Sequence, residues 1–120
     1  MTLYEWLTEI CSTEKPDDSI VAYNFGLFET DEGFTVYLVG SNEYNEADPD
    51  WACTETFVPK QKYFPLSSSE YENLDWQQVL ETFTAQLTRF TQTDSFINSF
   101  FVDAVAIKTG FDDGDLVNIC

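Results

Sequence analysis

Residues 20–40 read IVAYNFGLFETDEGFTVYLVG, and this stretch decides the expected fold. Apolar side chains alternate along both halves, and the short segment 30–33 between the halves is acidic and ends in glycine. Two alternating runs around a short turn predict a β-hairpin. Ile20, Ala22 and Phe28 lie on the face opposite the main apolar one. The hairpin is therefore expected either to be partly covered on both faces or to offer one face for docking.

Residues 75–90, DWQQVLETFTAQLTRF, predict the longest helix. Asp75 followed three positions later by Gln78 is typical of a helix N-terminus. The apolar positions recur at steps of three and four and are Trp76, Val79, Leu80, Phe83, Leu87 and Phe90. The opposite face is nearly uncharged and includes Thr82 and Gln86, where substitutions are expected to change stability little.

The remaining segments complete an α+β pattern. Thr2 and Glu5 fit a capping box before a short helix that ends near Ile10. A third strand is expected at 51–58, an irregular crossing at 60–64, a short helical turn at 95–101, and two final strands at 104–111 and 116–119. This order predicts a single domain over residues 1–120: an antiparallel sheet of about five strands, packed on one side by one long and one short helix.

Charge is the strongest compositional feature. The chain has 22 Asp and Glu against 5 Lys and Arg and no His, for a net charge of −17. Such a chain repels nucleic acid and anionic membranes and attracts cationic surfaces. Because 17% of the residues are aromatic and 43% hydrophobic, the acidity does not indicate disorder. The expected partner is a basic protein, and no direct contact with nucleic acid or membrane is expected.

The sequence also indicates a compartment. Residues 1–10 lack the basic and apolar regions of a signal peptide, and no run approaches the roughly 18 apolar residues of a membrane span. Cys11, Cys53 and Cys120 are an odd set with long spacings, which favours free thiols over disulfides. A cytoplasmic protein is therefore expected.

The sequence lacks several residues and motifs on which common catalytic mechanisms depend. Without His there is no imidazole base or metal ligand, and no glycine-rich loop precedes a helix to hold phosphate. A pair of carboxylates of the glycosidase type remains open by residue type, but a short chain with acids on tight loops is a poor scaffold for a sugar cleft. Core packing is expected for Cys53. The prediction is a non-enzyme without cofactor or metal.

Two acidic segments are the candidate partner-binding residues. Segment 41–50 holds four carboxylates and a tyrosine, and segment 112–115 is a tight acidic turn. Neither has the ligand alternation and distant glutamate of a calcium loop, so a solvated turn is the simpler interpretation of each. An aromatic among carboxylates is the usual makeup of an interface anchor with a charged rim. The candidate residues are Glu43, Tyr44, Glu46, Asp48, Asp50, Asp112, Asp113 and Asp115.

The chain resembles the small acidic bacterial immunity proteins that neutralise polymorphic toxins. The resemblance rests on Trp51-Ala52-Cys53 after an acidic loop, on the segment GFDDGDL at 110–116, and on the general character of the chain. It implies a binding role, in which the protein covers the active site of a toxin domain, often a basic nuclease. Two alternatives remain: a DNA-mimic inhibitor of a DNA-binding protein, and a domain whose charge serves solubility.

Overall fold

The alternating stretch at 20–40 forms the predicted hairpin. In the computed structural model, which describes residues 1–112 and 114–119, β1 (Ala22–Thr30) pairs antiparallel with β2 (Gly33–Ser41). Thr30 stabilises the turn, because its hydroxyl donates to the Gly33 carbonyl and accepts from the Glu32 N–H. Gly33 has a φ of 131°, a conformation that residues with a side chain rarely adopt.

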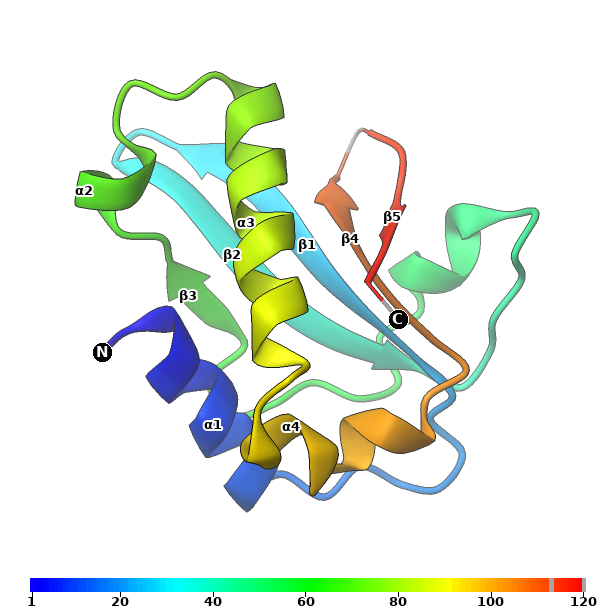
Figure 1. Ribbon diagram of the computed structural model, residues 1–120. Coiled ribbons are helices and arrows are strands. Elements are labelled where there is room, and N and C mark those ends of the chain that lie inside the picture. Colours follow the sequence, from blue (N-terminus) through cyan, green and yellow to red (C-terminus); the bar gives the residue numbers. More distant parts are fainter. Residues whose placement is uncertain (113, 120) are drawn as a thin grey trace.

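The sheet has the order β3-β2-β1-β4-β5 (Figure 1). Its other strands are β3 (Tyr63–Pro65), β4 (Ala106–Phe111) and β5 (Val117–Asn118). The predicted α+β class with five strands is confirmed, but the sheet is mixed, because β4 runs parallel to β1 while the other pairs are antiparallel. A parallel return is possible here because the long connection from β1 to β4 crosses the sheet through the helical layer.

The strand predicted at 51–58 is wrong. Residues Pro49–Cys53 form a 3-10 helix, η1, and Phe57 makes only an isolated bridge to Gly40. The Asp48 side chain caps η1 by accepting from the Asp50 N–H at 3.0 Å. The short edge strand β3 lies instead in the segment expected to be an irregular crossing.

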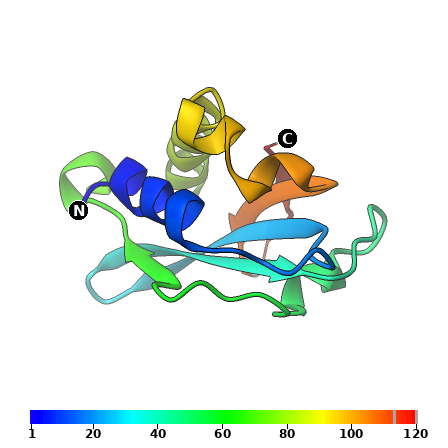
Figure 2. The same cartoon turned by 90° about the horizontal axis from the view of Figure 1, so that it is seen from below.

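Both predicted helices form, each with a capping box. They are α1 (Leu3–Thr13), capped by Thr2 and Glu5, and α3 (Trp76–Phe90), capped by Asp75 and Gln78. The helical turn expected at 95–101 appears as α4 (Asp94–Ile97) and η2 (Phe100–Asp103), whereas α2 (Ser68–Tyr71) was not predicted. The helices lie on one face of the sheet and η1 lies on the other (Figure 2). The segment that follows η1 runs along β2, where Gly40 and Phe57 exchange backbone hydrogen bonds and the Leu38 N–H donates to the Lys62 carbonyl. No helix within 1–112 and 114–119 is long and apolar enough to cross a membrane.

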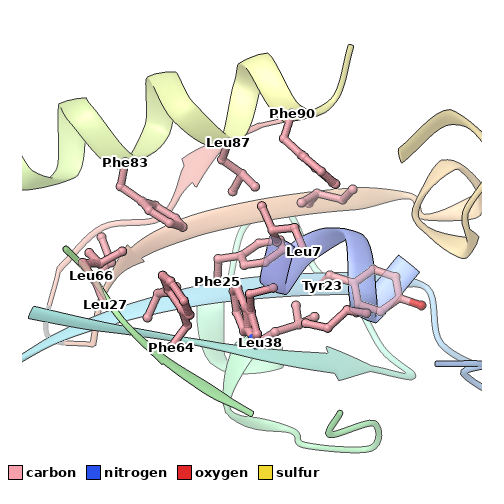
Figure 3. Close-up of a cluster of buried hydrophobic side chains, with 14 of the residues drawn as sticks. Leu7, Tyr23, Phe25, Leu27, Leu38, Phe64, Leu66, Phe83, Leu87 and Phe90 are labelled. Carbon is pink, nitrogen blue, oxygen red and sulfur yellow. The ribbon is translucent and has the colours of Figure 1, made fainter. Parts of the chain in front are cut away.

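The main core fills the space between the helices and the sheet (Figure 3). Phe83 of α3 is fully buried and its ring centroid lies 6.4 Å from that of Phe25 on β1. Trp6 of α1 is also fully buried, and its indole N–H donates to the Gln61 carbonyl at 2.9 Å. The long helix therefore packs on the sheet through most of its predicted stripe.

Two predictions about α3 are wrong. Trp76 is not part of the buried stripe: as the first residue of α3 it meets Phe111, the last residue of β4, and it stays 58% exposed. Gln86 is not on a free outer face. Its amide accepts from the Tyr71 hydroxyl at 2.5 Å and donates to the Glu70 carboxylate at 2.6 Å, so it ties α3 to the unpredicted α2.

Candidate functional site

The face of the sheet turned away from the helices carries the candidate site. Strand alternation places Ala22, Asn24, Gly26 and Phe28 of β1 on this face, opposite the core residues of the same strand. Trp51 of η1 packs here, in a small buried cluster with Ala22 and Ala106. The 3-10 helix η1 therefore covers only the part of this face around Ala22 and Ala106.

Beside η1 lies a hollow of about 390 Å³ whose lining includes Gly110, Gly114 and Leu116, from the end of β4 and the segment before β5. We refer to it as the acidic hollow. Its polar lining consists of Asn24, Tyr37, Asp50, Cys53, Glu55 and Asp112. The two acidic segments singled out in the sequence meet at this point, because Asp50 comes from one and Asp112 from the other.

The other candidate residues lie around the hollow or away from it. Glu43 accepts a hydrogen bond from the Thr54 hydroxyl at 2.8 Å and does not line the hollow. Tyr44 is half-buried and packs edge-on against Trp51, with ring centroids 5.2 Å apart. Glu46, Asp48 and Asp115 are exposed, and Asp113 lies outside the described residues. Binding of a partner by any of these residues stays a prediction.

Tyr37 positions the Asp112 carboxylate. The Tyr37 ring crosses the bare backbone of Gly26, where a Cβ atom would stand 2.1 Å from the ring, and its hydroxyl donates to Asp112 Oδ1. Burial, followed by this hydrogen bond and the charge of Asp112, raises the pKa of Tyr37. The phenol therefore stays neutral at physiological pH and acts as a permanent donor to Asp112.

Glu55 is the carboxylate of the hollow whose charge is compensated. Lys62 Nζ lies 2.7 Å from Glu55 Oε1, the one salt bridge among residues 1–112 and 114–119. The same ammonium stands 5.5 Å from the centroid of the Tyr37 ring and 5.1 Å from that of Tyr63. The hydrogen bond to Glu55 raises the pKa of Lys62, so this cation persists at physiological pH. Asp50 and Asp112 thus carry the uncompensated charge of the hollow.

Asn24 adds an acceptor at the floor of the hollow. It is 4% exposed, and its carboxamide Oδ1 is buried without a hydrogen-bond partner. Its register partner on β4 is Lys108, whose backbone position lies on the same face of the sheet. A buried polar atom without a partner is costly, so this oxygen favours a donor at this place.

Cys53 is exposed and lines the hollow, so the expected core packing of this residue is wrong. The residue alternation at 51–58 suggested a buried strand, whereas the turn of η1 directs this thiol outward. In the part of the chain that the structure describes, no group of three or more Cys, Asp or Glu is arranged to hold a metal ion. What the arrangement offers chemically to a partner is exposed carboxylate oxygens that accept from cationic donors.

Sequence reasoning missed Asn24, Tyr37 and Glu55 as lining residues. A signal existed for the first, because a polar residue and a glycine at positions 24 and 26 interrupt the apolar character of a central strand. Glycine in a strand often marks the close approach of another group. Here that group is the Tyr37 ring.

Comparison of the chain with protein-family models, with curated proteins and with solved structures finds no significant match.

Proposed function

We propose that this chain is a non-catalytic protein-binding module that engages a basic protein partner through the sheet face bearing the acidic hollow. The observation that carries the proposal is that the carboxylates in the described part of the chain are almost all exposed and almost all lack a salt bridge. All those in residues 1–112 and 114–119 are exposed except Glu14, which is half-buried, and within those residues only Glu55 forms a salt bridge. Within these ranges, most of the carboxylates behind the net charge of −17 are therefore presented to solvent without a cationic partner.

An exposed, uncompensated charge of one sign acts over the distance of encounter. It attracts a partner of opposite sign and raises the association rate, which falls again as salt screens the field. At physiological ionic strength the screening length is about 8 Å. A partner with Lys and Arg on its contact surface fits these requirements, and Asp50 and Asp112 supply acceptors that no salt bridge within the described ranges occupies.

An immunity protein that covers the active site of a basic toxin domain is the specific form of this function that we favour. Such a protein needs no catalytic group, and it acts by occupying its partner stoichiometrically. The compartment we propose is the cytosol, where thiols such as those of Cys11 and Cys53 stay reduced.

The test compares two variants of equal net charge. Asp50→Asn with Asp112→Asn neutralises the hollow, whereas Glu9→Gln with Glu81→Gln neutralises two exposed carboxylates on the helical layer. Each protein is immobilised, the partner is captured from lysate of the encoding cell and purified, and its association rate is measured at low and high salt. We expect the hollow variant to slow association at low salt and the helix variant to do so much less.

Equal effects of the two variants would show that net charge alone acts, and would overturn the assignment of the face. A third variant, Glu43→Gln with Glu46→Gln, measures the contribution of the exposed loop next to η1 in the same assay. Saturation at a fixed molar ratio of inhibitor to partner is expected. Turnover of the partner by substoichiometric protein would contradict a non-catalytic role.

Alkylation of Cys53 provides an independent footprint. Because this thiol lines the acidic hollow, a bound partner is expected to slow its reaction with iodoacetamide. Cys11 lies on the helical layer and serves as the internal control. Protection of neither thiol in the saturated complex would place the contact elsewhere.

A further inference from the structure

A second hollow adjoins the acidic one and has a different character. It has a volume of about 650 Å³ and lies between the N-terminal end of α3 and the adjacent ends of β1 and β4. Its apolar lining consists of Leu27, Phe28, Phe34, Trp76 and Phe111. We refer to it as the aromatic cleft. Asp112 lines both hollows, so the two sites form one continuous surface.

Trp76 is the side chain that makes the cleft unusual. All three tryptophans are described, and whereas Trp6 and Trp51 are 0% and 4% exposed, Trp76 is 58% exposed. Its ring stands edge-on to Phe111 at 6.2 Å, and Phe111 in turn stands edge-on to Phe34 at 5.9 Å. Tryptophan is among the residues enriched at the energetically dominant positions of protein interfaces, so an exposed tryptophan beside an apolar hollow is a candidate anchor.

The rim of the cleft is acidic. Glu29 lies on β1 and Asp112 follows β4, and both line the cleft and are exposed. Asp31 and Glu32, in the turn after β1, add two further exposed carboxylates nearby in the chain. An apolar hollow with such a rim is complementary to an apolar side chain flanked by cations and disfavours one flanked by acids.

The strand edge beside the cleft indicates how the occupant lies. The pairing of β1 with β4 stops at Leu27 and Phe111, whereas β1 continues to Thr30. Among the described residues, positions 28–30 thus have no strand neighbour on the β4 side. An extended segment can add to such an edge through main-chain hydrogen bonds while one of its side chains enters a neighbouring pocket.

We infer that the aromatic cleft is the anchor site for an extended segment of the basic partner, in which a bulky apolar side chain inserts beside Trp76 and flanking Lys or Arg residues pair with Glu29 and Asp112. The inference rests on the proposed function and specifies the chemistry of the contact. The apolar side chain supplies the buried area, and the flanking cations supply orientation and discrimination.

Trp76 itself reports on the test. Three probes are titrated into the intact protein: the pentapeptide amides acetyl-Lys-Arg-Leu-Arg-Lys, acetyl-Lys-Arg-Gly-Arg-Lys and acetyl-Glu-Asp-Leu-Asp-Glu. Because the other two tryptophans are buried, acrylamide quenching reads mainly Trp76. We expect the basic leucine peptide alone to give a saturable blue shift and protection from quenching.

Variants are compared by fluorescence polarisation of a dye-labelled leucine peptide. Trp76→Ala is expected to weaken binding by about tenfold or more, the usual effect of losing a central anchor. The matched control is Ile97→Ala, since Ile97 is a large apolar side chain on α4 that is 54% exposed and does not line the cleft. Circular dichroism and thermal melting confirm that both variants fold.

The absence of a saturable response to the leucine peptide overturns the inference, as does equal affinity for the leucine and glycine peptides or equal loss in the two variants. These outcomes are separable from failure of the proposed function. Salt-dependent association that requires Asp50 and Asp112 in the complex with the captured partner would persist if only the cleft assignment were wrong.

Discussion

Phe83→Ala tests the packing that holds the long helix on the sheet. Phe83 is 0% exposed, and its ring contacts the main core near Phe25 on the central strand. Its truncation removes the transfer free energy of a buried aromatic and leaves a cavity between two layers that can collapse only partly. The expected loss is about 3 to 5 kcal/mol. Such a loss is a large share of a typical total stability of roughly 5 to 15 kcal/mol.

Urea unfolding followed by circular dichroism measures this loss. Thr88→Ala is the matched control on the same helix, because Thr88 is exposed, and its expected effect is within about 0.5 kcal/mol. The midpoint of Phe83→Ala is expected to fall strongly with an unchanged dependence on urea. Similar small effects of both substitutions would refute the packing of α3 on the sheet.

Two further substitutions test single contacts, and an alkylation experiment tests the burial of a cysteine. Gln86→Ala removes both side-chain bonds that tie α3 to α2 and is expected to cost about 1 to 3 kcal/mol in urea unfolding; a loss no larger than that of Thr88→Ala would contradict this tie. Gly26→Ala puts a methyl group where the Tyr37 ring lies and is expected to cost about 1 to 3 kcal/mol; unchanged near-ultraviolet circular dichroism of the tyrosines would show that the ring had not moved. In the free protein at pH 7.5, Cys53 is expected to be alkylated faster than Cys11, because burial raises the pKa of Cys11 and lowers its thiolate fraction; peptide mapping by mass spectrometry decides, and the reverse order would be inconsistent with the structure.

Local patterns predicted the elements whose formation depends on near neighbours. The capping boxes of α1 and α3 and the turn of the β1–β2 hairpin each lie within a few residues, and each is present. The same reasoning failed for Trp51. Alternation around it resembled a strand, but the Asp48 cap and the packing of Trp51 on Ala22 and Ala106 give a 3-10 helix instead.

For the candidate site, the sequence predicts some of the residues but not how they are arranged in space. Asp50 and Asp112 were identified as acidic residues on loops, but their convergence depends on where η1 and the end of β4 come to lie. Trp76 was assigned to the buried stripe because its helical phase is right, yet it stands 58% exposed at the first residue of the helix. Helical phase shows on which side of the helix a residue lies, but it does not show whether the sheet covers that residue.

The sequence by itself determined the α+β class, the hairpin, the two main helices and the acidic character of the surface, because alternation, helical periodicity, capping and net charge are properties of neighbouring residues or of composition. Only the tertiary structure decided that β4 returns parallel to β1, that Gln86 is occupied by α2, and that an acidic hollow and an aromatic cleft share Asp112. Those features arise between segments far apart in the chain, and their positions follow from how the layers pack as a whole.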